Sequence, residues 1–361
     1  MTVLWINLAI VFIFAFLARY LTPPVLATNN FDVAIKPNKF FILVAMASLV
    51  AVSGLRANIG DTYFYKHIYI NNVFTWEYIL SQKDIGFGIL QRYLQQISED
   101  PQIMIFTTAL ITNVLIVWVL YKYSRMLEIS LYVYITGGLF LVSMNGIRQV
   151  LAAAILFSAT KFLIDGNWKA YFLVVLLAST FHQSALVMIP IYFIVRYKAW
   201  SKATLVLLLF SIVIVIGFEQ FSAILFSAIE ETTYGAYKDS TEGGANVLRV
   251  VVDAVPLVIA YFGREKLRTI FPNSDVIINM AIIGFMFMII STQNWIFARF
   301  SIYFSLYSLI LMSWVVKLFR EREQGLVYYG IVVCYFIYYY YESILSLNIN
   351  YRSEYITFFI G

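Results

Sequence analysis

Long apolar runs recur along almost the whole chain, from Val3 to Leu345, and they constrain the fold more than any other feature. Only 12% of the residues are charged and 61% are hydrophobic, whereas soluble domains carry about 25% charged residues. Runs of this length are typical of α-helices that cross a bilayer, while a β-barrel would show short alternating segments. We therefore expect an all-α, polytopic integral membrane protein, with residues 1–361 forming a single transmembrane domain.

One apolar run, residues 170–195, contains no charged side chain and is longer than the roughly 20 residues that one span needs. His182, one of two histidines in the chain, lies in its middle. The other runs predict spans near residues 3–18, 39–55, 102–121, 131–145, 147–164, 203–218, 248–263, 276–292, 296–316 and 326–345. The sequence thus indicates about 12 transmembrane or re-entrant helices.

The distribution of basic residues decides how the chain passes through residues 170–195. If the run were one span, fewer than half of the 25 Lys and Arg residues would fall inside; if the chain turns near His182, most of them do. Each half of the run would be a helix of about 18–20 Å, short of the ~30 Å hydrocarbon core. We therefore predict a broken helix pair near His182, with His182 in a cavity that faces outward.

The same topology places three arginines, Arg56, Arg148 and Arg299, on the outer side at membrane level. Arg148 and Arg299 lie near predicted helix N-termini, whose dipoles favour anions. Guanidinium groups bind phosphate oxygens bidentately, so the pattern indicates an anionic, amphipathic ligand with a phosphate or pyrophosphate. The alternatives are arginines that anchor at the lipid headgroups, and a His182 that is only a polar core residue.

Two outer loops are expected, at about residues 56–101 and 219–247. The first mixes acidic residues, among them Asp61 and Asp84, with many aromatic residues such as Tyr65, as a sugar-binding surface would. The aromatic residues also suit an interfacial belt, and Asp61 suits either a helix N-cap or an active-site carboxylate. The second loop is acidic and fits a mobile lid, an acceptor platform or a solvated loop without a role.

The sequence lacks the motifs of several kinds of functional site. It contains no nucleotide-binding glycine-rich loop, no zinc-ligand spacing and no serine nucleophile elbow. The single cysteine, Cys334, excludes an intramolecular disulfide. The net charge of +5 comes from basic residues clustered at helix ends, which matches orientation signals better than nucleic-acid binding. We therefore expect no metal, no cofactor and no nucleic acid.

Five short motifs carry a resemblance to a known family. They are Arg56 followed by Gly60-Asp61-Thr62 and Tyr65, Asp84-Ile85-Gly86-Phe87, Asn145-Gly146-Ile147-Arg148-Gln149, Phe181-His182-Gln183-Ser184-Ala185-Leu186, and Phe297-Ala298-Arg299-Phe300. With these motifs the chain resembles the EpsG family of Wzy-like exopolysaccharide polymerases, over nearly its full length. It resembles O-antigen ligases more remotely.

The resemblance implies an enzyme that polymerises oligosaccharide repeat units carried on undecaprenyl pyrophosphate, at the outer face of a bacterial cytoplasmic membrane. It implies a membrane-lipid environment and, as partners, other polysaccharide-assembly proteins such as a flippase and a chain-length regulator.

Within this reading His182 is the general base, with Asp61 as the second candidate. The substrate-binding residues would be Arg148 and Arg299 on the pyrophosphate, helped by Arg56, together with Gln149, Tyr65 and Asp84.

Three other functions remain open. A flippase or transporter of lipid-linked oligosaccharides would also need a polar cavity and basic residues. An O-antigen-type ligase would differ only in its acceptor. A non-catalytic scaffold would tolerate the loss of His182.

Overall fold

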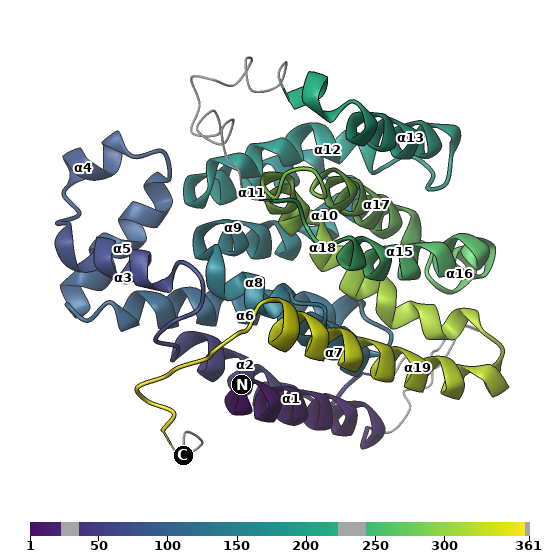
Figure 1. The fold of residues 1–361 in the computed structure, drawn as a ribbon, viewed down its shortest axis with the longest axis horizontal. Helices are drawn as coiled ribbons and strands as arrows, with labels where there is room; N and C mark the ends of the chain where they lie inside the picture. The colour runs from purple at the N-terminus through teal and green to yellow at the C-terminus, as the bar shows by residue number, and fades with distance from the viewer. Residues whose placement is uncertain (23–35, 223–242, 358–361) are drawn as a thin grey trace. The chain divides into compact units, whose positions relative to one another are not determined.

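The computed structural model describes residues 1–22, 36–222 and 243–357, and every regular element in these ranges is helical (Figure 1). Within these ranges three helices are long and apolar enough to cross a membrane, α1 (Thr2–Tyr20), α6 (Gln102–Tyr123) and α18 (Ile296–Val315) with its short extension to Leu318. A bent helix pair, counted as one span, gives a fourth. The all-α membrane fold is confirmed, while a total of about 12 membrane helices stays a prediction.

The chain divides into two compact units. The first unit contains residues 1–192 and 312–361, and the second unit contains residues 193–311. Most of the second predicted outer loop, with Glu230, Glu231, Asp239 and Glu242, lies outside the described residues.

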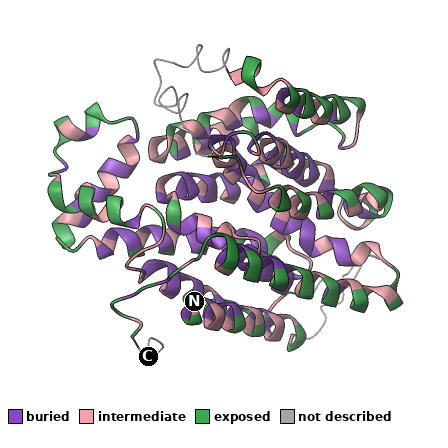
Figure 2. Ribbon diagram, viewed as in Figure 1, coloured by how far each residue is buried: buried purple, intermediate pink, exposed green. Residues whose placement is uncertain are grey.

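The first unit is built around helices that are buried on most sides. Its further long elements are α2 (Lys39–Gly54), α7 (Leu127–Thr136), α9 (Ile147–Ser158), α11 (Trp168–Phe181) and α19 (Glu321–Tyr340). Every residue of α7 is buried, as are most residues of α9, and Figure 2 shows both helices largely in the colour of buried residues. Helix α9 packs between α6 and α11, so its first turn lies inside the unit.

The chain reverses direction at His182, as the charge distribution predicts. Helix α11 ends at Phe181, His182 is extended (φ −156°, ψ 115°), and a short 3₁₀ helix (Gln183–Val187) leads into α12 (Met188–Ile194). The ring of Tyr192 near the end of α12 lies 5.4 Å from that of Tyr171 in the first turn of α11. The start of one helix therefore meets the end of the other, and the two form a hairpin with His182 at its tip.

Two of the expected spans are interrupted. The span expected over residues 131–145 is bent by 55° between α7 and α8 (Leu139–Asn145). Gly138 at the bend has φ +88°, a left-handed conformation that glycine adopts at little cost. The span expected over 147–164 is divided at Ala159, after which α10 (Thr160–Asp165) begins.

The first predicted outer loop folds into three short helices, α3 (Thr62–Asn71), α4 (Trp76–Ser81) and α5 (Ile85–Ile97). Figure 1 shows them gathered together at one end of the first unit. Their apolar faces bury Tyr69, Phe74 and Phe87 in one cluster with Met104 of α6. Burial of such large side chains stabilises the loop, at roughly 1.5–3 kcal/mol for each.

The C-terminal segment runs across the start of the same loop. The hydroxyl of Tyr351 donates to the carbonyl oxygen of Val52 (2.8 Å), and that of Ser353 donates to Leu55 (2.6 Å). The backbone N–H of Ala57 donates in turn to the carbonyl oxygen of Arg352 (2.8 Å). This segment therefore fixes the residues on both sides of Arg56.

The second unit contains α13 (Lys202–Ile216), α15 (Val247–Phe262), α16 (Arg264–Ile270), α17 (Ser274–Ile290) and most of α18. Helix α17 packs against both α13 and α15. A Cβ atom on Gly284 of α17 would lie 2.9 Å from the Cβ atom of Phe304, so this glycine lets α17 approach α18 closely.

Candidate active site

The carboxylate of Asp84 brings together three segments that are far apart in the sequence. Its Oδ2 atom accepts a hydrogen bond from Nη1 of Arg148 (2.8 Å) and lies 3.5 Å from Nδ1 of His182. Its Oδ1 atom accepts a hydrogen bond from the backbone N–H of Gln183 (3.1 Å). Asp84, Arg148 and His182 therefore form one cluster in the first unit.

Local sequence explains how each member reaches this position. Asp84 occupies the N-cap position of α5, and Gly86 in the first turn lies against Thr180 of α11. A Cβ atom on Gly86 would lie only 2.2 Å from Oγ1 of Thr180 and 3.1 Å from its backbone carbonyl carbon, so α5 could not approach α11 with a larger residue there. The break of the hairpin then presents His182 to the start of α5.

His182 faces the carboxylate through one ring nitrogen. Its side chain is 20% exposed, and Nδ1 is buried without a hydrogen bond of normal length among the described residues. At 3.5 Å the contact with Asp84 is longer than a standard hydrogen bond, so it is a weak one. A carboxylate beside Nδ1 favours the proton on Nδ1, which leaves Nε2 as an acceptor.

The pKa of Asp84 reflects its neighbours. Burial alone would raise this pKa, but contact with His182, the charge of Arg148 and the N–H of Gln183 together outweigh burial and hold it below the ordinary value of 3.8. Asp84 is therefore ionised at neutral pH, which leaves a fixed negative charge between the imidazole and the guanidinium.

Arg148 is anchored at one nitrogen and remains partly accessible. Its side chain is 43% exposed, and Nε is buried with no hydrogen-bond partner among the described residues. The guanidinium carbon lies 5.8 Å from the ring centre of Tyr65, and the Asp61 carboxylate is close enough to interact with it electrostatically. Arg148 thus keeps donors for an anionic ligand, beside an aromatic ring and a second carboxylate.

Asp61 lies in the first unit at the start of α3. It takes the N-cap position, but its side chain makes no capping hydrogen bond. Its backbone N–H donates to Oδ1 of Asn145 (3.0 Å), and the preceding Gly60 has φ +50° with no room for a Cβ atom beside Asn145. The backbone is therefore fixed while the carboxylate remains uncommitted to capping.

Arg56 is fully buried, with 1% of its surface exposed. Its guanidinium donates to the Thr62 hydroxyl (Nε, 2.9 Å), to the Met144 carbonyl oxygen (Nη2, 2.9 Å) and to the Ser53 carbonyl oxygen (Nη1). It thereby ties the end of α2, the start of α3 and the end of α8 together. The sequence does not reveal this role, because a backbone carbonyl oxygen that accepts from an arginine can belong to a residue of any type.

Gln149 and Arg299 are the two remaining substrate-binding candidates. Gln149 follows Arg148 on α9 but is buried, with 5% of its surface exposed. Arg299 belongs to the second unit, in the first turn of α18, with its guanidinium carbon 4.9 Å from the ring centre of Trp295. Within the first unit the structure thus brings Asp61, Tyr65, Asp84, Arg148 and His182 to one neighbourhood.

Two contributions to the cluster went unrecognised in the sequence. One is the backbone N–H of Gln183, which binds Asp84. The other is the side chain of Asn145, which binds the backbone beside Asp61. Asn145 could have been suspected, because it stands three residues before Arg148 in an otherwise apolar segment.

Comparison with family models matches the EpsG family over residues 39–353. No curated protein and no solved structure gives a match. The matched range includes all five motifs and each member of the Asp84 cluster. Because the match covers most of the chain, the protein belongs to the EpsG family.

Proposed function

We propose that this protein is a Wzy-like glycosyltransferase that joins oligosaccharide repeat units carried on undecaprenyl pyrophosphate, without a metal or nucleotide cofactor. Membership of the EpsG family points to a polymerase of exopolysaccharide assembly. The observation that carries the chemistry is the Asp84 carboxylate, which contacts both a histidine and an arginine. Transfer from a pyrophosphate donor requires a base and an anion-binding group, and this cluster supplies one of each.

His182 is the proposed general base. The acceptor hydroxyl oxygen attacks the anomeric carbon of the donor sugar, and its proton passes to Nε2 of His182. Asp84, at Nδ1, orients the ring and stabilises the imidazolium that forms. Asp84 is thus proposed as a positioning residue instead of a direct sugar ligand, and Asp61 remains the second candidate for the base.

Arg148 is the proposed ligand of the leaving group. As the glycosidic bond forms, the bond from the anomeric carbon to the pyrophosphate oxygen breaks, and its electron pair stays on that oxygen. The partly exposed guanidinium would stabilise the increasing negative charge more in the transition state than in the ground state. Arg299 is proposed to contribute a second cation, and Gln149 to support Arg148 from within the unit.

Arg56 and Tyr65 have supporting roles in this proposal. Arg56 fixes the loop that carries Asp61, through its contacts with Thr62 and Met144. The ring of Tyr65 lies beside Arg148 and offers an apolar face on which a sugar can stack.

Direct attack of the acceptor hydroxyl on the donor inverts the configuration at the anomeric carbon, so an α-linked donor should give a β-linked polymer.

The site is proposed to face outward across the cytoplasmic membrane. Gln183 is exposed and directly follows His182, which makes Gln183→Cys a suitable position for labelling once Cys334 is replaced by Ala. A membrane-impermeant maleimide added to intact cells should label position 183. Labelling only after the cells are opened would contradict this orientation.

The decisive test is reconstitution with purified lipid-linked repeat units. The wild-type protein should produce a ladder of longer glycans, and His182→Ala should abolish it. His67→Ala is the matched control, because His67 is the other histidine and lies exposed on α3. Transport of the lipid-linked units that survives in His182→Ala would indicate a flippase, and a single transfer without a ladder would indicate a ligase.

A further inference from the structure

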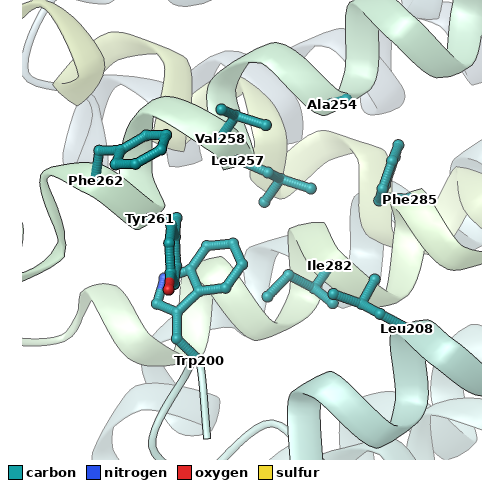
Figure 3. A pocket seen from close by; sticks show the side chains of 9 residues that line it. All are labelled: Trp200, Leu208, Ala254, Leu257, Val258, Tyr261, Phe262, Ile282 and Phe285. Atoms are coloured by element: carbon teal, nitrogen blue, oxygen red, sulfur yellow. The ribbon is translucent and has the colours of Figure 1, made fainter.

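The second unit encloses an apolar pocket of about 350 Å³ between α13, α15 and α17. Figure 3 shows its side chains around an open centre, with Trp200 and Tyr261 at one end and Phe285 at the other. The rest of the lining includes Leu208, Leu257 and Ile282. A lining of this composition accepts hydrocarbon and offers almost no hydrogen bonds to a polar ligand.

A smaller, more polar pocket of about 210 Å³ adjoins the aromatic end. The two pockets share Trp200, Leu208 and Tyr261, and the smaller one is also lined by Ser201, Lys202 and Thr204. No acidic side chain among the described residues lies within ion-pair distance of Lys202. The guanidinium carbon of Arg264 lies 4.7 Å from the ring centre of Tyr261. A continuous site therefore has an apolar body and a cationic end.

The segment that carries Trp200 is held rigidly. Nη2 of Arg268 donates to the carbonyl oxygen of Ala199 (3.0 Å), and Nδ2 of Asn279 donates to that of Tyr197 (2.6 Å). Trp200 itself has φ 60°, a left-handed conformation that is unfavourable for a bulky residue and that clusters at ligand sites.

The indole of Trp200 supplies an unused donor. Its Nε1 atom is buried and has no hydrogen-bond partner among the described residues. A buried donor without a partner costs free energy, which a ligand oxygen at this position would recover.

We propose that this site binds an anionic phospholipid, with one acyl chain in the apolar pocket and the phosphate near Lys202 and Arg264. An apolar cavity joined to Lys202 and an orphaned N–H matches an amphiphile with an anionic head, because a headgroup without net charge would leave Lys202 without a counter-charge. Arg264, whose Nε lies 3.6 Å from a carboxylate oxygen of Glu265, adds a second cation nearby. Leu205 and Leu209 of α13 and Phe262 of α15 are exposed, so apolar side chains that suit a lipid environment lie beside the two pockets. The charge pattern of the chain predicts that Lys202 and Arg264 face the cytoplasm, where the lipid would come from the inner leaflet.

Native mass spectrometry of the full chain in neutral detergent tests the proposal. Phosphatidylglycerol and phosphatidylcholine with identical 16-carbon chains are titrated in parallel, and phosphatidylglycerol should bind more tightly. Each cation near a membrane surface contributes about fivefold in affinity, so Lys202→Gln with Arg264→Gln should weaken phosphatidylglycerol binding about thirtyfold. The matched control is Lys161→Gln with Lys169→Gln, since Lys169 also lies beside a tryptophan ring but lines neither pocket described here.

Two further arms separate the head from the tail. Trp200→Phe keeps an aromatic ring in the wall but removes the N–H together with part of the ring system, so it should weaken phosphatidylglycerol binding while the protein still folds. Shortening the acyl chains should lower affinity by about fourfold for each methylene that the pocket no longer buries. Glycerol 1-phosphate, which has no chain, should not bind measurably.

Three results would overturn the proposal. The first is equal affinity for phosphatidylglycerol and phosphatidylcholine. The second is an equal loss of phosphatidylglycerol affinity in the double variant and in its control. The third is binding of glycerol 1-phosphate as tight as that of the whole lipid. None of these readouts involves glycan synthesis, so the outcome is independent of the polymerase assay.

Discussion

Asp84→Asn is the most informative single change, because it keeps the shape of the side chain and removes its charge. The amide oxygen can still accept from Gln183 or Arg148, but the amide NH₂ can occupy the place beside Nδ1 of His182. An NH₂ group there favours the imidazole tautomer with its proton on Nε2, which cannot act as a base. We expect the variant to fold and to lose turnover.

The magnitude follows from the two contacts of the carboxylate. General-base catalysis contributes about 10²–10⁴-fold, and the 3.5 Å contact to His182 places Asp84 at the lower end, so kcat should fall about 10²-fold. Weakening the charged hydrogen bond to Arg148 costs about 1 kcal/mol, so KM for the lipid-linked donor should change by only about fivefold. Glu99→Gln, an exposed carboxylate of the same loop, is the control and should leave both constants unchanged.

The assay is the initial rate of glycan extension in proteoliposomes, measured for Asp84→Asn, His182→Ala and the double variant. If Asp84 acts through His182, its replacement should have little further effect once the imidazole is absent. Full multiplication of the two losses would refute the reasoning, as would a rate for Asp84→Asn within threefold of wild type.

The pH dependence of stability provides a second check on the same residue. Because the folded-state pKa of Asp84 lies below 3.8, its ionised form contributes stability that is complete above the unfolded-state pKa and is lost as the pH falls through the folded value. The difference in unfolding midpoint between wild type and Asp84→Asn should therefore be constant above about pH 5 and shrink in acid. A difference that grows in acid would contradict the assigned charge state.

Three further changes test the surrounding structure. Gly86→Ala should cost about 1–3 kcal/mol of stability and most activity, because its Cβ atom would collide with Thr180, and Thr180→Ala should restore part of both when thermal unfolding and glycan extension are measured. Arg56→Met should lower the unfolding midpoint strongly, by about 3 kcal/mol, since two buried carbonyl oxygens lose their donors, whereas an unchanged midpoint would exclude the anchoring role. Tyr351→Phe removes one hydrogen bond to Val52 and should cost about 1 kcal/mol, with faster proteolysis of the first outer loop as the second readout.

The sequence predicts the helices better than their interruptions. The starts of α2 and α6 agree with the expected spans, because each begins where polar residues give way to an apolar run. The reversal at His182 was predictable from the charges on either side of it. The bend at Gly138 was not, because glycine is common within membrane helices and only tertiary packing shows which one bends the chain.

The sequence predicts which residues belong to the candidate site better than it predicts how they are arranged. His182 and Arg148 stand out because polar side chains are costly in apolar surroundings. Asp84 belongs to a loop with several other acidic residues, and its pairing with partners 64 and 98 positions away depends on how α5 packs against α11. The contacts of Arg56 could not be predicted, since a buried arginine that donates to backbone oxygens has the same sequence signature as a ligand-binding one.

We propose that glycosidic-bond formation and pyrophosphate release occur together at the Asp84, Arg148 and His182 cluster. The most direct test counts the undecaprenyl pyrophosphate released for each linkage formed in the reconstituted system. Wild type and His67→Ala should release one molecule per linkage at equal rates, and His182→Ala should lose release and linkage together. Linkage formation in His182→Ala at the wild-type rate would contradict the account.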